Sequence, residues 1–140
     1  MAEMTPEQRD AFLRETRIAK LATLNGDGSP NVVPIWFEWD GREALLFTAR
    51  GSAKVRRIER DPRVALTVEE GVGVPEAWVS IEGTATILAE GAWPLINRLI
   101  NRYYLDDRAA NARASWSRMK EEWRVIRITP SRIRSSAPEE

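Results

Sequence analysis

The sequence contains no cysteine and no histidine. The absence of cysteine excludes disulfide bonds, thiolate metal sites and cysteine nucleophiles. The absence of histidine removes the most common general base and a frequent metal ligand, which excludes a Ser-His-Asp triad, a zinc site of the usual type and a histidine-ligated haem. We therefore expect no metal site, and a bound organic cofactor would have to supply any demanding chemistry.

Long apolar runs and net charge are also missing. No apolar stretch approaches the roughly 20 residues that cross a bilayer, and the start MAEMTPEQRDAFLRE lacks the hydrophobic centre of a signal peptide. The 21 basic and 21 acidic side chains cancel, so no overall field attracts nucleic acid. We expect a cytoplasmic protein that binds neither membrane nor nucleic acid, and any anion site must be local.

What is present fits one globular domain, residues 1–140, because 43% of the residues are hydrophobic and 30% are charged. Thr5, Pro6 and Gln8 form a helix start with a capping box, and the helix should end near Arg14. Alternation then predicts strands in RIAKLATL, NVVPIWFEWD and EALLFTA. Asn-Gly and Asp-Gly turns between them predict a meander.

The rest of the chain mixes strands and helices. RVALTVEE, EAWVSIEGTATIL and WRVIRITP read as strands, the last one closed by its proline. WPLINRLINRYYL has helical spacing, a second helix is expected from about residue 111 to 122, and SSAPEE should be loose. Pro34 cannot donate to a ladder, so it predicts an interrupted strand at an edge or a bulge. Such a set of strands indicates a barrel or a sandwich.

Positive charge concentrates in FTARGSAKVRRIERDP, residues 47–62, which holds five basic and two acidic side chains. Its spacing predicts a strand end followed by a helix from Ser52 to Pro62. Basic residues in a first helical turn oppose the helix dipole, so an anion bound there would relieve the conflict. The alternative is a solvated helix face, which we favour for Arg56, Arg57 and Arg60.

Three stretches, LATLNGDGSPNVVPIWFEWDG, LLFTARGSAKVRRIERDPRVALTV and WVSIEGTATI, resemble the pyridoxamine 5'-phosphate oxidase-like, split β-barrel flavin-binding family. The resemblance is greatest to its small single-domain members that depend on FMN or coenzyme F(420). It implies a mainly β fold with helices (α+β), a six-stranded split β-barrel of the FMN-binding type. It also implies a homodimer with two cofactor sites in grooves between the subunits.

The resemblance also assigns site residues. The edge of the flavin ring would lie against one strand, the phosphate would lie at the strand-to-helix junction, and a third segment would face the partner's ring. The residues at the ring edge would be Val33, Pro34, Ile35 and Trp36. Those at the phosphate would be Thr48, Arg50, Ser52, Ala53 and Lys54, and those facing the partner's ring would be Trp78, Val79 and Ser80. Packing in the core or at the dimer interface is the alternative for Trp36 and Trp78, and it is favoured over stacking on the flavin. Surface salt bridges are favoured over phosphate contacts for Arg127 and Arg132.

The function expected from this resemblance is an oxidoreductase that transfers hydride between its cofactor and a small organic substrate. F(420) is slightly favoured over FMN, because Arg57 and Arg60 would suit its acidic tail. No catalytic side chain is identified, and the proton would come from solvent, Ser80 or Thr48. A carrier or sensor that binds a flavin or tetrapyrrole without turnover is the alternative. A barrel that binds a partner or nucleic acid is disfavoured by the zero net charge.

Overall fold

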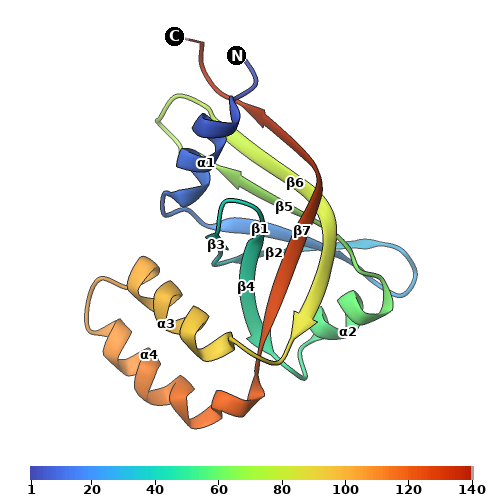
Figure 1. The fold of residues 1–140 in the computed structure, drawn as a ribbon, viewed down its shortest axis with the longest axis vertical. Coiled ribbons are helices and arrows are strands. Elements are labelled where there is room, and N and C mark those ends of the chain that lie inside the picture. The colour runs from blue at the N-terminus through green and yellow to red at the C-terminus, as the bar shows by residue number, and fades with distance from the viewer. Residues whose placement is uncertain (140) are drawn as a thin grey trace.

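The computed structural model describes residues 1–139, which form an antiparallel sheet of seven strands, four α-helices and one 3-10 helix. The strands are β1 (Ala19–Leu24), β2 (Pro30–Ile35), β3 (Glu38–Trp39), β4 (Ala44–Ala49), β5 (Arg63–Glu69), β6 (Trp78–Leu88) and β7 (Trp123–Ser136). The helices are α1 (Pro6–Arg14), α2 (Ala53–Arg60), α3 (Ala92–Tyr103), α4 (Arg108–Trp116) and the 3-10 helix η1 (Ser117–Glu122). Figure 1 shows α3 and α4 at the end of the molecule away from both termini.

The strand order is β2-β1-β5-β6-β7-β4-β3, so β2 and β3 form the two edges of the sheet. β2 ends at Ile35 and β3 begins at Glu38. Three Cα steps cover at most about 11 Å, so the two edges must approach each other there. The sheet therefore curls into an incompletely closed barrel, which confirms the mixed α+β, split-barrel character (Figure 1).

Two details of the strand prediction are corrected. The expected strand over residues 31–40 is divided at Trp36 and Phe37, so the structure has seven strands where six were expected. The meander is correct in part: both hairpins form, β1 with β2 and β3 with β4, but the divided strand places them at opposite edges of the sheet, and β4 also pairs with β7. Hairpin turns are local signals, but β7, the second partner of β4, lies more than 70 residues away in the sequence.

Pro34 does not interrupt its strand, although it does lie in an edge strand as expected. It stands opposite Lys20 in the ladder of β1 and β2, and Pro30 stands opposite Leu24. Proline has no N–H, so these are non-hydrogen-bonded pairs, and alternation makes Val32 opposite Ala22 another one. The backbone groups of residues 30, 32 and 34 therefore point away from β1. Val32 supplies the one N–H among these three positions.

β7 continues past Pro130, where the sequence predicted its end. Gly83 pairs with Pro130 and Glu82 with Arg132, so Ser131 is an extra residue that forms a bulge. The bulge accommodates the proline and lets the ladder continue to Ser136. The expectation that SSAPEE is loose is wrong for its first residues, because Ala2 and Ala137 exchange backbone hydrogen bonds of 2.8 and 2.9 Å.

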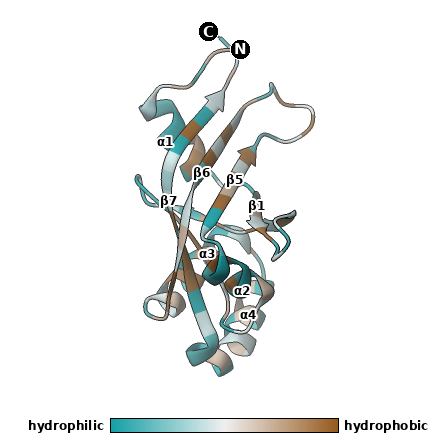
Figure 2. Ribbon diagram, turned by 90° about the vertical axis from the view of Figure 1, so that its right-hand side faces the viewer, coloured by the Kyte–Doolittle hydropathy of each residue, from teal (hydrophilic) through white to brown (hydrophobic). Residues whose placement is uncertain are grey.

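The barrel interior is filled by every second residue of its strands. Leu21, Leu46, Leu66, Ile81 and Ile126 are among the side chains with no exposed surface. Their neighbours along each strand face outward, so hydrophobic and hydrophilic residues are interspersed along β5, β6 and β7 (Figure 2). We call the sheet surface away from this core the outer face. A second apolar cluster packs α3 and α4 against β4 and β7.

The bulge leaves no space for a side chain at position 83, which can be tested by substituting Gly83. A Cβ atom at this position would lie 2.2 Å from the carbonyl oxygen of Thr129, a backbone atom that cannot move independently. We expect Gly83→Ala to lower the free energy of unfolding by at least about 2 kcal/mol. Gly71→Ala is the control, because nothing lies within 4 Å of a Cβ there. Urea denaturation of both variants checks this, and equal stability would contradict it.

Candidate functional site

The junction between β4 and α2 forms as the sequence predicted. Ser52 caps α2, and its Oγ accepts a hydrogen bond from the Val55 N–H at 3.3 Å. The Thr48 hydroxyl, which is buried, donates to the same oxygen at 2.9 Å. Both acceptor positions of Ser52 are thus occupied, so its own O–H is left to donate outward. The first-turn N–H groups of Ala53 and Lys54 have no acceptor within the helix.

The two expected phosphate-binding cations differ in availability. The Arg50 Nε lies 2.6 Å from Glu122 Oε2, and its backbone N–H donates to the Glu122 carbonyl at 2.8 Å. Lys54 is half-buried, and no carboxylate of residues 1–139 lies within ion-pair distance of its Nζ. No acidic side chain occupies the first turn of α2. The unrelieved positive charge at this helix start therefore belongs mainly to Lys54 and the backbone.

The remaining basic residues of α2 contact the protein itself. Arg57 Nε donates to Asn25 Oδ1 at 2.8 Å. The Arg60 guanidinium lies 3.4 Å from the point where a Cβ atom would stand if residue 26 were not glycine. Arg57 therefore holds the β1–β2 turn against α2, which corrects its interpretation as part of a solvated helix face, whereas Arg60 is exposed as that interpretation predicted. Arg56 is exposed, and its Nη1 donates to the carbonyl of residue 51 at 2.7 Å.

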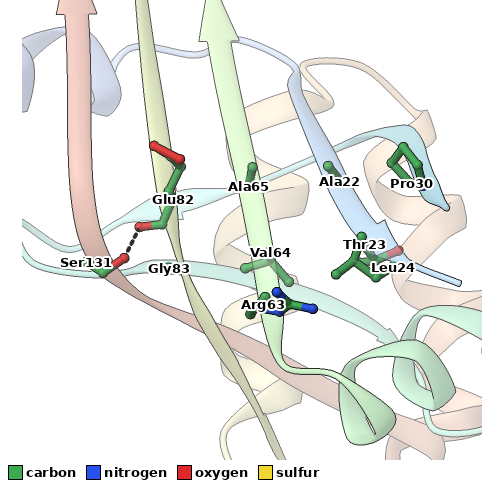
Figure 3. Close-up of a pocket in the computed structure, with 10 residues that line it drawn as sticks. All are labelled: Ala22, Thr23, Leu24, Pro30, Arg63, Val64, Ala65, Glu82, Gly83 and Ser131. Carbon is green, nitrogen blue, oxygen red and sulfur yellow. Dashed lines mark hydrogen bonds between the residues drawn. The ribbon is translucent and has the colours of Figure 1, made fainter. Parts of the chain in front are cut away.

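A groove of about 340 Å³ crosses the outer face (Figure 3). Ala22 of β1 and Ala65 of β5 stand opposite each other on its floor, beside Gly83 of β6. The small side chains of these two alanines leave this surface hollow. Larger residues form its sides, namely Leu24, Pro30, Arg63, Glu82 and Ser131. The groove was not predicted from the sequence, although the alanines at outward positions of two strands indicate it.

The ladder register aligns part of the predicted ring site on this outer face. Pro34, Lys20, Thr67 and Ser80 occupy successive strands in one row, next to the row that holds Ala22 and Ala65. Trp78, 36% exposed, lies two residues before Ser80 on the same face. The three strand spacings from Pro34 to Ser80 amount to about 14 Å.

Three other predicted residues point toward the interior. Val79 has no exposed surface, and Ile35 packs against the barrel core. Val33 pairs with the buried Leu21 and shares its face of the sheet. Only the backbone of these residues can take part in a site on the outer face.

Trp36 lies in an aromatic cluster beneath the helices, as the packing alternative predicted. Its ring stacks on Tyr103 with a centroid distance of 4.8 Å and meets Tyr104 edge-on at 4.8 Å. Trp116 lies 6.1 Å away. The cluster fixes the connection between β2 and β3, because the Tyr103 hydroxyl accepts the Phe37 N–H at 3.3 Å and donates to the Arg17 carbonyl at 2.6 Å.

Ion pairs account for several charges near the groove. Arg63 binds Asp61 at 2.7 Å, and its hydrogen bonds lower the pKa of that carboxyl to about 2. Arg127 lies 3.7 Å from Glu43, in line with the surface ion pair expected for it, whereas Arg132 is exposed. In residues 1–139, no cluster of acidic side chains has the make-up of a metal site, and no helix is long and apolar enough to cross a membrane.

Comparisons with known proteins agree with this architecture. The family described as Pyridoxamine 5'-phosphate oxidase matches residues 5–137. An F420H(2)-dependent biliverdin reductase from Mycobacterium tuberculosis is 35% identical over 79 residues, which are 55% of this chain and 55% of that protein. The match thus spans about half the length of that curated relative.

Two solved structures show the same fold. A conserved hypothetical protein from Mycobacterium tuberculosis has a TM-score of 0.77 and 28% identity. The match covers 98% of this chain and 91% of the chain of that protein. An F420 reductase has a TM-score of 0.72 and 24% identity, covering 89% of this chain and 94% of its own. The likeness extends over nearly the whole chain, so it includes the helices as well as the barrel.

The hydroxyl of Tyr103 provides a prediction about the β2–β3 connection. Tyr103→Phe keeps the stacked ring but leaves the Phe37 N–H and the Arg17 carbonyl without this partner, so we expect a loss of about 1 to 3 kcal/mol in unfolding free energy. Tyr104→Phe is the matched control, because no hydrogen bond to its hydroxyl is found within residues 1–139. Thermal and urea unfolding measure both, and equal losses would contradict the assignment.

Proposed function

This chain belongs to the pyridoxamine 5'-phosphate oxidase family, and from that premise we propose that it is an oxidoreductase that uses bound F(420) or FMN. The bound ring would supply hydride transfer to a small organic substrate. The protein would supply binding, orientation and exclusion of water. This division of roles suits a chain without histidine or cysteine.

The observation that carries the proposal is the anion-binding geometry at the start of α2. Ser52 has an O–H free to donate, Lys54 has no ion-pair partner in the described chain, and the first-turn N–H groups are open. A phosphate would satisfy all three kinds of donor. FMN carries a phosphate, and F(420) carries a phosphodiester, so both have the required group.

F(420) remains the favoured cofactor, but for a different reason. Arg57 is engaged by Asn25, so of the two arginines only the exposed Arg60 is available to an acidic tail. The support comes instead from the F420H(2)-dependent relative, which is 35% identical over the matched region. The proposal to use F(420) rests on that relationship.

Ser80 is the better of the two hydroxyl proton donors considered. Thr48 is buried and donates to Ser52 at 2.9 Å, so its proton is engaged. Ser80 faces outward and accepts a hydrogen bond from Thr67 at 3.3 Å, which leaves its own proton free. We infer that Ser80 or solvent protonates the substrate.

We further propose that two copies of the chain pair through the outer face. Val32 is 61% exposed, Ile18 40% and Trp78 36%, and they lie on or beside the same face as Ala22 and Ala65. Solvated outer faces of antiparallel sheets are normally polar. A partner there would cover this apolar surface and complete the sides of the open groove.

The first test concerns Lys54. If its ammonium binds the cofactor phosphate, Lys54→Ala removes a charge-assisted hydrogen bond worth about 1.5 to 3 kcal/mol and should weaken binding by about 10- to 150-fold. The phosphate does not react, so turnover at saturating cofactor should fall much less. Fluorescence titrations with FMN and F(420) measure the affinities.

Arg108→Ala is the control for Lys54→Ala, because Arg108 is exposed, pairs with Asp106 and is the first residue of α4. It should change affinity by less than about twofold. Unchanged binding of both cofactors by Lys54→Ala would sink the proposed phosphate site. Binding of FMN alone by the parent would overturn the preference for F(420).

The second test concerns the dimer. A buried carboxylate opposes association, so Val32→Asp should convert the dimer to monomer at micromolar concentration. Leu105→Asp is the matched control, because Leu105 is 89% exposed and lies between α3 and α4. Sedimentation velocity distinguishes the states. A monomeric parent, or a Val32→Asp variant that remains dimeric, would contradict pairing through this face.

A further inference from the structure

A second groove lies where α1, the β3–β4 turn and the middle of β7 meet. Its volume is about 470 Å³, and it is lined by Arg9, Trp39, Arg42, Thr129, Pro130 and Ile133, among others. The β3–β4 turn precedes β4, whereas the α2 junction follows it, so the two places are separated by the length of this strand, about 16 Å. This groove is therefore distinct from the proposed phosphate site, and binding in it would not depend on the proposed function.

Asp40 and Glu43 also line this groove, and Glu43 pairs with Arg127, which is not one of the lining residues, at 3.7 Å. Asp40 Oδ1 accepts two backbone N–H groups of its own turn, at 2.8 and 2.7 Å. Glu43 Oε2 accepts the Thr129 hydroxyl at 2.7 Å, and Asp10 Oδ1 accepts the Trp39 indole N–H at 2.7 Å. These hydrogen bonds fix the carboxylates in place without using an arginine of the groove.

The guanidinium groups of the groove, in contrast, lack acceptors. The Nε of Arg9 is buried and has no hydrogen-bond partner. Arg42 is exposed, and no carboxylate of residues 1–139 lies within 4 Å of either guanidinium. Arg14 adds further positive charge. Its Nη2 lies 3.1 Å from the point where a Cβ atom would stand on Gly41, in the β3–β4 turn. An anion in the groove would therefore meet guanidinium groups that no carboxylate of residues 1–139 pairs with.

We propose that this groove binds a small organic anion. Carboxylate or phosphate oxygens would accept hydrogen bonds from Arg9 and Arg42, for which the planar guanidinium is well suited. The apolar part of the ligand would lie against Pro130, Ile133 and the small part of Trp39 that reaches the groove, since this side chain is only 4% exposed. One oxygen each of Asp10, Asp40 and Glu43 is held by these hydrogen bonds, and no ion pair within 4 Å joins these carboxylates to Arg9 or Arg42 in residues 1–139.

The test uses the indole N–H signal of Trp39, identified by its loss in Trp39→Phe. Benzoate, phenyl phosphate and inorganic phosphate are titrated at constant ionic strength into ¹⁵N-labelled Lys54→Ala protein, in which the first anion site is weakened. We expect benzoate and phenyl phosphate to shift this signal saturably. The double variant Arg9→Gln, Arg42→Gln should bind them at least about 10-fold more weakly. The control Arg118→Gln, an exposed arginine of η1, should bind them like the parent.

Three results would overturn the proposal. One is a Trp39 signal that does not move at millimolar benzoate or phenyl phosphate, and another is equal binding by the double variant and the control. The third is inorganic phosphate binding as tightly as phenyl phosphate, which would exclude a role for the apolar surface. If the double variant fails to fold, Arg42→Gln alone decides, because its exposed side chain contributes little to stability. Unchanged binding by that single variant would equally contradict the site.

Discussion

The short connection through Trp36 and Phe37 is the constraint on which the rest of the structure depends. It joins the two edges of one sheet, so the sheet has to curl and a closed interior results. Phe37 turns into that interior with no exposed surface, while Trp36 turns outward to the aromatic cluster that holds α3. Tyr103 bonds both to this connection and to Arg17, just before β1. One helix thereby fixes the closure and covers the barrel end.

Curling separates the two faces of every strand, and the candidate site follows from that separation. Bulky residues fill the inside, while the outside carries Ala22 and Ala65 at directly opposed positions. The resulting groove lies beside the edge strand β2. There Pro30 and Pro34 remove two of three outward N–H groups, which protects the edge from pairing with another strand. The edge still offers carbonyl oxygens and the N–H of Val32, which suit a polar ligand better than a further strand.

Local patterns in the sequence predicted local structure well. The capping box at Thr5, the cap at Ser52 and the turn after Leu24 all form, because each depends on residues close in sequence. The errors concern contacts between distant segments. The sequence near Pro130 does not indicate that Gly83 and a bulge accommodate the proline. The sequence near Ser135 does not indicate that its hydroxyl accepts a hydrogen bond from the Met4 N–H. For the same reason, Trp36 could be assigned either to packing or to ligand contact until its neighbours from α3 were known.

Charge shows the same limit most clearly. The composition is neutral, yet neutrality does not determine which cations remain available, because that depends on what each carboxylate binds after folding. Glu122 pairs with Arg50 across more than 70 residues, so of the two adjacent cations Lys54 is the one left without a partner in the described chain. Around Trp39 the carboxylates accept neutral donors, and Arg9 is left with a buried, unpaired Nε. A chain with no net charge can therefore form local anion-binding sites wherever folding gives its carboxylates neutral partners.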